Sequence, residues 1–179
     1  MSAIDHLIHA NEQYASTFPG PRPLRPRLRL AVIACMDSRL DLFGALGLDI
    51  GDAHLIRNAG GLPTEEVLRS LAISQRLLGT REVVLIHHTE CGMQGFDDDG
   101  FRTTLTAETG RAPGWDVAGF SDLHDTMRAS IETVRRCEWL QHREDVVEIA
   151  IRQRLHEELF EVGLVEQLDD DLSGLNAFL

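Results

Sequence analysis

Two apolar runs that end in metal-binding side chains constrain this chain more than any other feature of the sequence. Residues 30–34 are all apolar and lead directly into Cys35, while residues 83–86 lead into His87, His88 and, three residues later, Cys91. Short runs rich in Val, Ile and Leu are typical of strands that are buried on both faces of a parallel sheet. We therefore expect two buried strands, each of which delivers sulfur or imidazole ligands at its carboxyl end.

The segments around these runs predict an α/β fold. Strands are expected at 29–35, 53–57 and 82–88, with helices at 39–47 and 63–78 between them. Alternating strands and helices predict an open, doubly wound, mainly parallel sheet. In such a sheet, ligands bind beyond the carboxyl ends of the strands, where the strand order reverses. Cys35 and His88 can meet there only if the first and third strands are neighbours, which requires the order 2-1-3.

The segment after Cys91 carries weaker signals. Helices are expected at 101–109 and 121–136, where apolar residues recur at helical spacing. Residues 146–151 alternate in a way that also fits a last strand. Because Arg, Glu and Gln surround them, we expect instead a helix that runs toward Phe160.

The N-terminal segment predicts an association between subunits. An amphipathic helix is expected at 3–17, followed by four prolines between positions 19 and 26, which favour an extended arm. The expected division is a helix and arm over 1–28, an α/β domain over 29–165 and a loosely ordered tail over 166–179. A helix on a stiff arm can reach a second copy of the chain, so we expect a homodimer or a higher homo-oligomer.

Cys35, His88 and Cys91 form the candidate metal site. Two residues between His88 and Cys91 let one turn present both side chains to a single ion. Two thiolates and an imidazole suit zinc, and a shell of three protein ligands leaves one position for water, as catalytic zinc sites do. We expect one Zn²⁺ per chain. His87 should point to the opposite face and pack in the core, and Cys137 should be a packed or free thiol.

Asp37 and Arg39 follow the first candidate ligand at intervals of two residues. Extended backbone would place all three side chains on one side of the chain. A carboxylate there can ligate the metal or accept a hydrogen bond from its water, while an arginine holds that carboxylate bidentately and keeps it charged. An isolated Asp-x-Arg pair is usually a surface ion pair. Directly after a candidate ligand, we expect Asp37 and Arg39 to be catalytic.

Composition narrows the classes of partner and compartment. The net charge of −12 argues against nucleic acid or an anionic membrane surface as a partner. No apolar run approaches the roughly 20 residues of a membrane span, and residues 1–19 lack the pattern of a secretory signal. Three cysteines in such a chain favour a reducing compartment, so we expect a cytoplasmic protein without disulfides.

Three motifs, in order and spacing over about residues 27–93, resemble those of the β-class carbonic anhydrases: Cys35-x-Asp37-x-Arg39, Arg57-Asn58-Ala59-Gly60-Gly61 and His88-x-x-Cys91-Gly92. The helix with Asn11 and Tyr14 is similar to that of small bacterial members. The resemblance implies a doubly wound α/β fold, zinc on the two cysteines and the histidine, and the Asp–Arg pair at the site. It also implies a dimer with sites near the interface and the first helix over the partner. Small members end in a strand that contains glycine and aromatic residues, which residues 144–179 do not show, so the sequence leaves the closing edge strand open.

The activity that the resemblance implies is the reversible hydration of carbon dioxide to bicarbonate and a proton, by a zinc lyase (a carbonate dehydratase). Asp37 would orient the attacking water and Arg39 would position Asp37. Because thiolates donate more charge than imidazoles, activity should be greater at alkaline pH. Two alternatives stay open: hydrolysis of carbon disulfide or carbonyl sulfide with the same ligands, and a non-catalytic zinc module for regulation or assembly. A redox pair is not expected, because Cys35 and Cys91 are not in a C-x-x-C motif.

Overall fold

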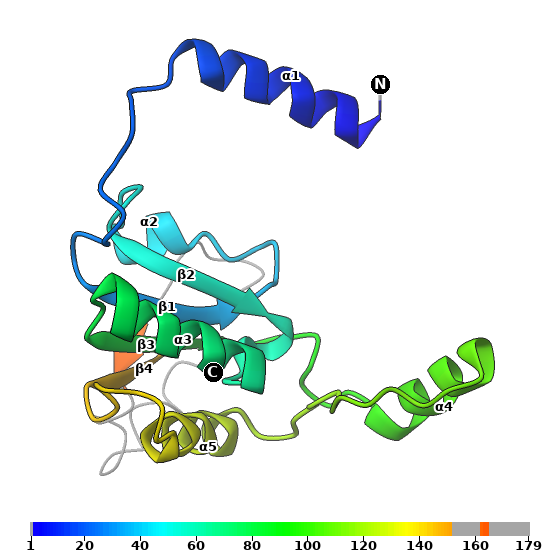
Figure 1. The fold of residues 1–179 in the computed structure, drawn as a ribbon. Helices are drawn as coiled ribbons and strands as arrows, with labels where there is room; N and C mark the ends of the chain where they lie inside the picture. The colour runs from blue at the N-terminus through cyan, green and yellow to red at the C-terminus, as the bar shows by residue number, and fades with distance from the viewer. Residues whose placement is uncertain (1, 152–161, 165–179) are drawn as a thin grey trace, which may run out of the picture.

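The fold is a five-stranded sheet with helices on both faces (Figure 1). The structure is a computed structural model that describes residues 2–151 and 162–164. The elements in chain order are α1 (Ala3–Ser16), β1 (Leu30–Cys35), α2 (Leu42–Leu46), β2 (Ala53–Asn58), the short 3₁₀ turn η1 (Ala59–Gly61), α3 (Glu65–Leu78), β3 (Glu82–His88), α4 (Asp98–Thr109), α5 (Leu123–Arg136), β4 (Val146–Ile151) and β5 (Val162–Leu164). The strands up to β3 and the helices up to α5 confirm the sequence prediction to within a few residues at their ends.

The strand order places the ends of β1 and β3 side by side. The order is β2-β1-β3-β4-β5, in which β1 to β4 are parallel and β5 is antiparallel to β4. The chain moves from β1 to β2 on one side and then crosses back to β3 on the other, so the order reverses between β1 and β3. This confirms the predicted order 2-1-3. Cys35 at the end of β1 and His88 at the end of β3 therefore both lie at the reversal.

The sheet is buried because helices cover both of its faces. Alternate residues of β1 face opposite sides, as the pleat requires: Ala31 and Ile33 belong to one core cluster, Val32 and Ala34 to the other. The first cluster is completed by side chains of α3, β3 and α5: Val67, Leu71, Val83, Leu85 and Val134. The second includes Leu42 of α2. Because the sheet is buried on both faces, the central strands are continuous apolar runs in the sequence.

The glycines after β2 form a turn that closes against the ends of β1 and β3. Gly61 has a φ of +69°, and a Cβ there would lie 2.7 Å from the Cys35 nitrogen and 2.9 Å from the Ile86 oxygen. Backbone atoms cannot give way cheaply, so only glycine fits. The Asn58 side chain fixes the turn, since its Nδ2 donates to the Leu62 oxygen at 2.8 Å and its Oδ1 accepts from the Leu62 nitrogen at 2.9 Å. The turn thus supports the backbone of the first candidate ligand.

One expectation for the C-terminal segment is wrong. Residues 146–151 form strand β4, paired with β3, and not the start of a helix. The charge of Glu148 was a misleading signal of a solvent-exposed helix, because this side chain is buried beside His87. The short strand β5 closes the edge of the sheet, a feature that the sequence left open. The end of the expected helix near Phe160 and the tail 166–179 lie outside the described residues.

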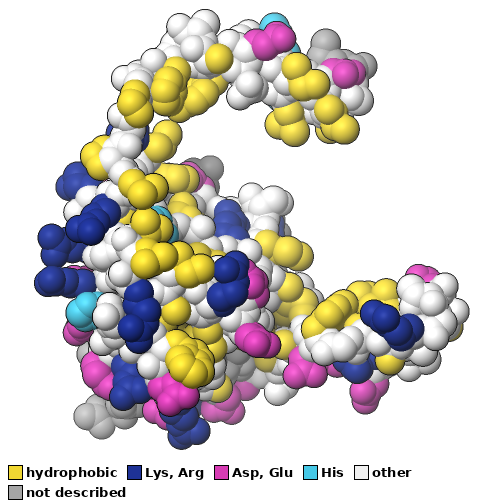
Figure 2. Space-filling view, viewed as in Figure 1, with side chains coloured by type: hydrophobic (Ala, Val, Ile, Leu, Met, Phe, Trp, Pro, Cys, Tyr) yellow, Lys and Arg dark blue, Asp and Glu magenta, His cyan; other side chains and the backbone are white. Residues whose placement is uncertain are grey.

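Helices α1 and α4 project away from the body of the molecule (Figure 1). Neither helix contains a buried residue. The apolar side chains of α1 form one exposed face, visible as yellow atoms along the projecting helix in Figure 2: Ile4, Leu7, Ile8 and Tyr14. No residue that the structure describes covers that face, and an association between subunits would explain this exposure. The predicted division at residue 28 stays a prediction.

Candidate metal centre

The fold brings the three predicted metal ligands together at the carboxyl edge of the sheet. Cys35 ends β1, His88 ends β3, and Cys91 lies in the turn that follows β3. Their possible ligand atoms all lie within 4.8 Å of one another, and the two sulfur atoms are 3.8 Å apart. Each of the three residues is at most 5% exposed. The cluster is therefore buried and compact enough to bind a single ion.

The donor set and its geometry fit zinc. With Zn–S bonds of about 2.3 Å, two sulfurs on a tetrahedral ion are separated by about 3.8 Å. The Nδ1 of His88 donates to the Thr89 oxygen at 2.9 Å, which leaves the lone pair of Nε2 available. This Nε2 is buried and has no hydrogen-bond partner among the described residues. Burial lowers the pKa of His88, which favours the neutral imidazole that a metal requires.

The thiols make metal binding sensitive to pH. In the metal-free chain, burial raises the pKa of the Cys91 thiol, and the nearby Cys35 raises it further. A metal must displace the thiol protons before it binds the sulfurs. Because protons compete with the metal, the affinity of this cluster for zinc is expected to fall as the pH falls.

Arg39 holds the Asp37 carboxylate against the cluster. The backbone nitrogen and Nε of Arg39 donate to Oδ1 of Asp37 at 2.9 and 3.0 Å, and Nη2 donates to Oδ2 at 2.6 Å. These hydrogen bonds hold the pKa of Asp37 well below its usual range, so the carboxylate stays ionised. Oδ2 lies 3.9 Å from Nε2 of His88. This oxygen also accepts a longer hydrogen bond from Nε of Arg39 at 3.2 Å, and it lies beside the cluster of Cys35, His88 and Cys91.

The Asp37–Arg39 pair is formed by a turn and not by extended backbone, which corrects the expectation from spacing. Strand β1 ends at Cys35, and the Leu40 backbone nitrogen donates to the Asp37 backbone oxygen at 3.1 Å, which closes a turn. The turn folds the Arg39 side chain back onto the carboxylate. The pair therefore depends on the turn that follows the strand, whereas an alternating strand would only have placed both side chains on one side.

Arg57 organises this turn, a role that the sequence did not indicate. Its Nε donates to the Cys35 backbone oxygen at 2.9 Å, its Nη1 to the Leu40 backbone oxygen at 3.3 Å and its Nη2 to the Asp37 backbone oxygen at 2.5 Å. Three donors of one guanidinium thus satisfy three carbonyls of the segment between the first ligand and α2. Arg57 lies in one of the matching motifs, but only coordinates show which carbonyls it contacts.

Glu90 joins the two ligand-bearing turns and was also not identified from the sequence. Nη2 of Arg39 donates to the Glu90 backbone oxygen at 3.0 Å, and Nη1 lies 3.8 Å from the Glu90 carboxylate. Glu90 has a φ of +56°, a left-handed conformation that side-chain-bearing residues rarely adopt. In the sequence, the signal that could have identified Glu90 is its position between the candidate ligands His88 and Cys91. Arg39 therefore connects the Asp37 turn to the Cys91 turn.

The two residues that were expected to lie outside the metal site do so. His87 is buried on the opposite side of β3, where its Nδ1 lies 3.3 Å from the Glu148 carboxylate. Burial raises the pKa of Glu148, and its contact with His87 connects β4 to β3. Cys137 is buried and unpaired at the end of α5.

Comparisons with known proteins agree with this geometry. A family model described as carbonic anhydrase matches residues 30–157. The chain is 48% identical over 134 residues to β-carbonic anhydrase 1 of Mycobacterium tuberculosis, a match that covers 75% of this chain and 82% of that protein. It is 38% identical over 127 residues to a carbon disulfide hydrolase of Acidithiobacillus thiooxidans, a match that covers 70% of this chain and 61% of the hydrolase.

A solved structure has the same fold. The carbonic anhydrase of Streptococcus mutans superposes with a TM-score of 0.77 at 37% identity, over 85% of this chain and 93% of that one. The family model spans both of the strands that carry candidate ligands, β1 and β3. The chain therefore belongs to the β-class carbonic anhydrases.

Proposed function

We propose that the protein catalyses the reversible hydration of carbon dioxide to bicarbonate and a proton, with one zinc ion per chain held by Cys35, His88 and Cys91. The observation that carries this proposal is the Asp37 carboxylate, which Arg39 holds with Oδ2 only 3.9 Å from Nε2 of His88. A zinc site that only stabilises a fold needs no oriented carboxylate at its edge. The pair therefore favours a catalyst over a regulatory or assembly module.

Each residue of the pair has a distinct part in the reaction. When bound, zinc lowers the pKa of a water ligand from about 15.7 toward 7 and so supplies a nucleophile near neutral pH. Oδ2 of Asp37 accepts a hydrogen bond from the attacking water and orients it toward carbon dioxide. Arg39 fixes the direction of this carboxylate through three donors. Arg57 holds the turn on which both residues lie.

Hydrolysis of carbon disulfide would use the same ligands and is the second candidate. The similarity to β-carbonic anhydrase 1 is greater and extends over more of the relative than the similarity to carbon disulfide hydrolase. The test is a stopped-flow assay of carbon dioxide hydration by the zinc-loaded chain, run beside a carbon disulfide assay and a metal analysis. We expect saturable hydration far above the buffer rate. Turnover of carbon disulfide with no hydration would overturn the assignment.

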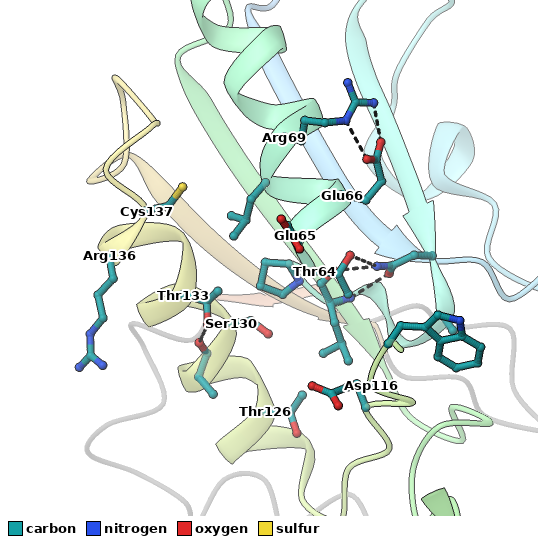
Figure 3. A pocket seen from close by; sticks show the side chains of 18 of the residues that line it. Thr64, Glu65, Glu66, Arg69, Asp116, Thr126, Ser130, Thr133, Arg136 and Cys137 are labelled. Carbon is teal, nitrogen blue, oxygen red and sulfur yellow. Dashed lines mark hydrogen bonds and ion pairs between the residues drawn. The ribbon is translucent and has the colours of Figure 1, made fainter. Parts of the chain in front are cut away.

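We also propose that the chain forms a homodimer in which α1 packs on the partner. A 14-residue helix without buried residues is marginal in water unless its apolar face is covered. The body offers a groove of about 1720 Å³ between α3 and α5. Figure 3 shows Glu65 on the α3 side of this groove and Thr126, Ser130 and Thr133 along α5. Apolar side chains that include Ile73 and Trp139 contribute to its lining.

Changes to the apolar face of α1 should weaken the dimer. Deletion of residues 1–18 or the change Leu7→Glu should shift the protein toward monomer, because each removes apolar surface that the partner would cover. Sedimentation velocity at micromolar concentration measures the effect. Gln13→Glu, which adds the same charge to the polar side of the helix, should leave the dimer intact. A full-length chain that sediments as a monomer would refute the proposal.

The compartment that we propose is the cytoplasm. The cysteines at positions 35, 91 and 137 are all free thiols, which suits a reducing environment. Over residues 2–151 and 162–164, no helix combines the length and the apolar character that crossing a bilayer would take.

A further inference from the structure

A second hollow, of about 390 Å³, lies at the opposite edge of the sheet from the metal centre. Its lining includes Arg29, which directly precedes β1, and Arg81, which directly precedes β3. Arg25 and His142 complete a ring of basic side chains, and no Asp or Glu is among the eight residues that line the hollow. We call this site, defined by Arg25, Arg29, Arg81 and His142, the arginine pocket.

The arginine pocket is unusual for so acidic a chain. The protein has 29 Asp and Glu residues against 17 basic ones, and all 17 are arginine. Several arginines outside the pocket have acidic partners: Arg27 is bonded to Asp52 at 2.7 Å, and Arg69 to Glu66 at 2.6 Å. The three guanidinium groups of the pocket form no hydrogen bond or ion pair with any residue that the structure describes. Figure 2 shows arginine side chains gathered at the left edge of the body, below the arm that carries α1.

The backbone beneath the pocket is fixed, so the points from which Arg29, Arg81 and His142 extend are set before any ligand binds. The Arg81 nitrogen donates to the Arg29 oxygen at 2.7 Å, and Arg29 has a φ of +55° in the turn before β1. The buried Gln75 side chain holds His142 at both ends of its backbone, since Nε2 donates to the His142 oxygen at 2.8 Å and Oε1 accepts from the His142 nitrogen at 3.0 Å. Three guanidinium groups with like charge line one hollow, and an anion bound there would be attracted to all of them.

We propose that the arginine pocket binds a phosphate-class oxyanion. Planar guanidinium groups bind tetrahedral oxyanions bidentately, and several of them around one hollow match an ion with two or more charges. The volume lies in the range of small-ligand sites. The lining contains no Phe, Tyr or Trp on which a nucleobase could stack, so the recognised group is the phosphate itself. This inference is independent of the hydration reaction, because the pocket and the metal centre lie at opposite ends of β1 and β3.

The test is isothermal titration calorimetry of the zinc-loaded full chain with inorganic phosphate and, in a parallel arm, with glycerol phosphate. We expect saturable binding with a dissociation constant at or below about 1 mM. The double variant Arg29→Gln/Arg81→Gln should weaken binding by at least about tenfold, because each change removes charged donors to the anion. Tighter binding of the free ion would identify inorganic phosphate as the ligand, and tighter binding of the ester would identify a phosphorylated metabolite.

The matched control is Arg111→Gln/Arg128→Gln, which removes the same charge from positions outside the pocket lining. It should bind phosphate as the parent chain does. Equal weakening in the control and pocket variants would show a general effect of net charge and would overturn the proposal. So would a double pocket variant that binds like the parent chain, because the anion would then occupy another place, such as the metal centre. Absence of saturable binding to the parent chain up to about 10 mM would also overturn it.

Discussion

Replacing Cys35 or Cys91 with serine should remove most of the zinc and abolish measurable hydration of carbon dioxide. The two sulfurs lie 3.8 Å apart, the separation that a shared tetrahedral ion requires. A serine hydroxyl at either position is not ionised near neutral pH and reaches less far, so the site keeps only two of its three ligands. We expect zinc affinity to fall by more than about a hundredfold. Metal analysis after dialysis against a weak chelator, beside stopped-flow hydration, measures both losses.

Cys137→Ser is the matched control for this experiment. Cys137 is also a buried free thiol, but it lies at the end of α5 in the core cluster on the other side of the sheet. The variant should keep a full complement of zinc and the parent hydration rate, even if its stability falls. Full zinc occupancy in Cys35→Ser or Cys91→Ser would show that the ligands have been assigned wrongly.

The cluster of Cys35, His88 and Cys91 could be predicted because its geometry follows from local sequence patterns and one rule of sheet topology. Cys35 directly follows the apolar run 30–34, and His88 closely follows the apolar run 83–86; such runs form strands that are buried on both faces. The rule that ligands bind where strand order reverses then places both residues at one edge. Only the order of three strands had to be inferred, and the requirement that Cys35 meet His88 determined it.

The contacts that hold the site could not be predicted in the same way. Arg57 donates to the backbone carbonyls of Cys35, Asp37 and Leu40. Every residue has such a carbonyl, so the sequence does not show which carbonyls accept these hydrogen bonds. The turn at Asp37 likewise depends on where β1 stops. Glu148 shows the opposite problem, because a charged residue usually marks an exposed face. Here Glu148 is buried in contact with His87, so its charge led to the prediction of a helix where strand β4 is found.

Asp37→Ala and Arg39→Ala should each keep zinc but lower the rate of carbon dioxide hydration by roughly a hundredfold. Neither residue belongs to the cluster of candidate ligands. Without Arg39 the pKa of Asp37 rises toward its ordinary value, which is still far below neutral, so the carboxylate stays charged at pH 7. The loss in Arg39→Ala would therefore come from orientation: the freed carboxylate can turn away from the water or ligate the metal itself.

The pH dependence separates this mechanism from a surface ion pair. Hydration by the parent chain should rise from neutral to alkaline pH, because Cys35 and Cys91 donate more negative charge to the site than imidazoles would, so that the attacking water ionises at higher pH. Asp37 does not cause this rise, since its lowered pKa leaves it ionised throughout the range. Arg128→Ala, which breaks the exposed pair with Asp125 at 3.1 Å, is the control and should hydrate carbon dioxide like the parent chain. If Asp37→Ala and Arg39→Ala also match the parent rate across this range, the pair has no part in catalysis. A loss of zinc in either variant would instead show that the pair supports the metal site itself.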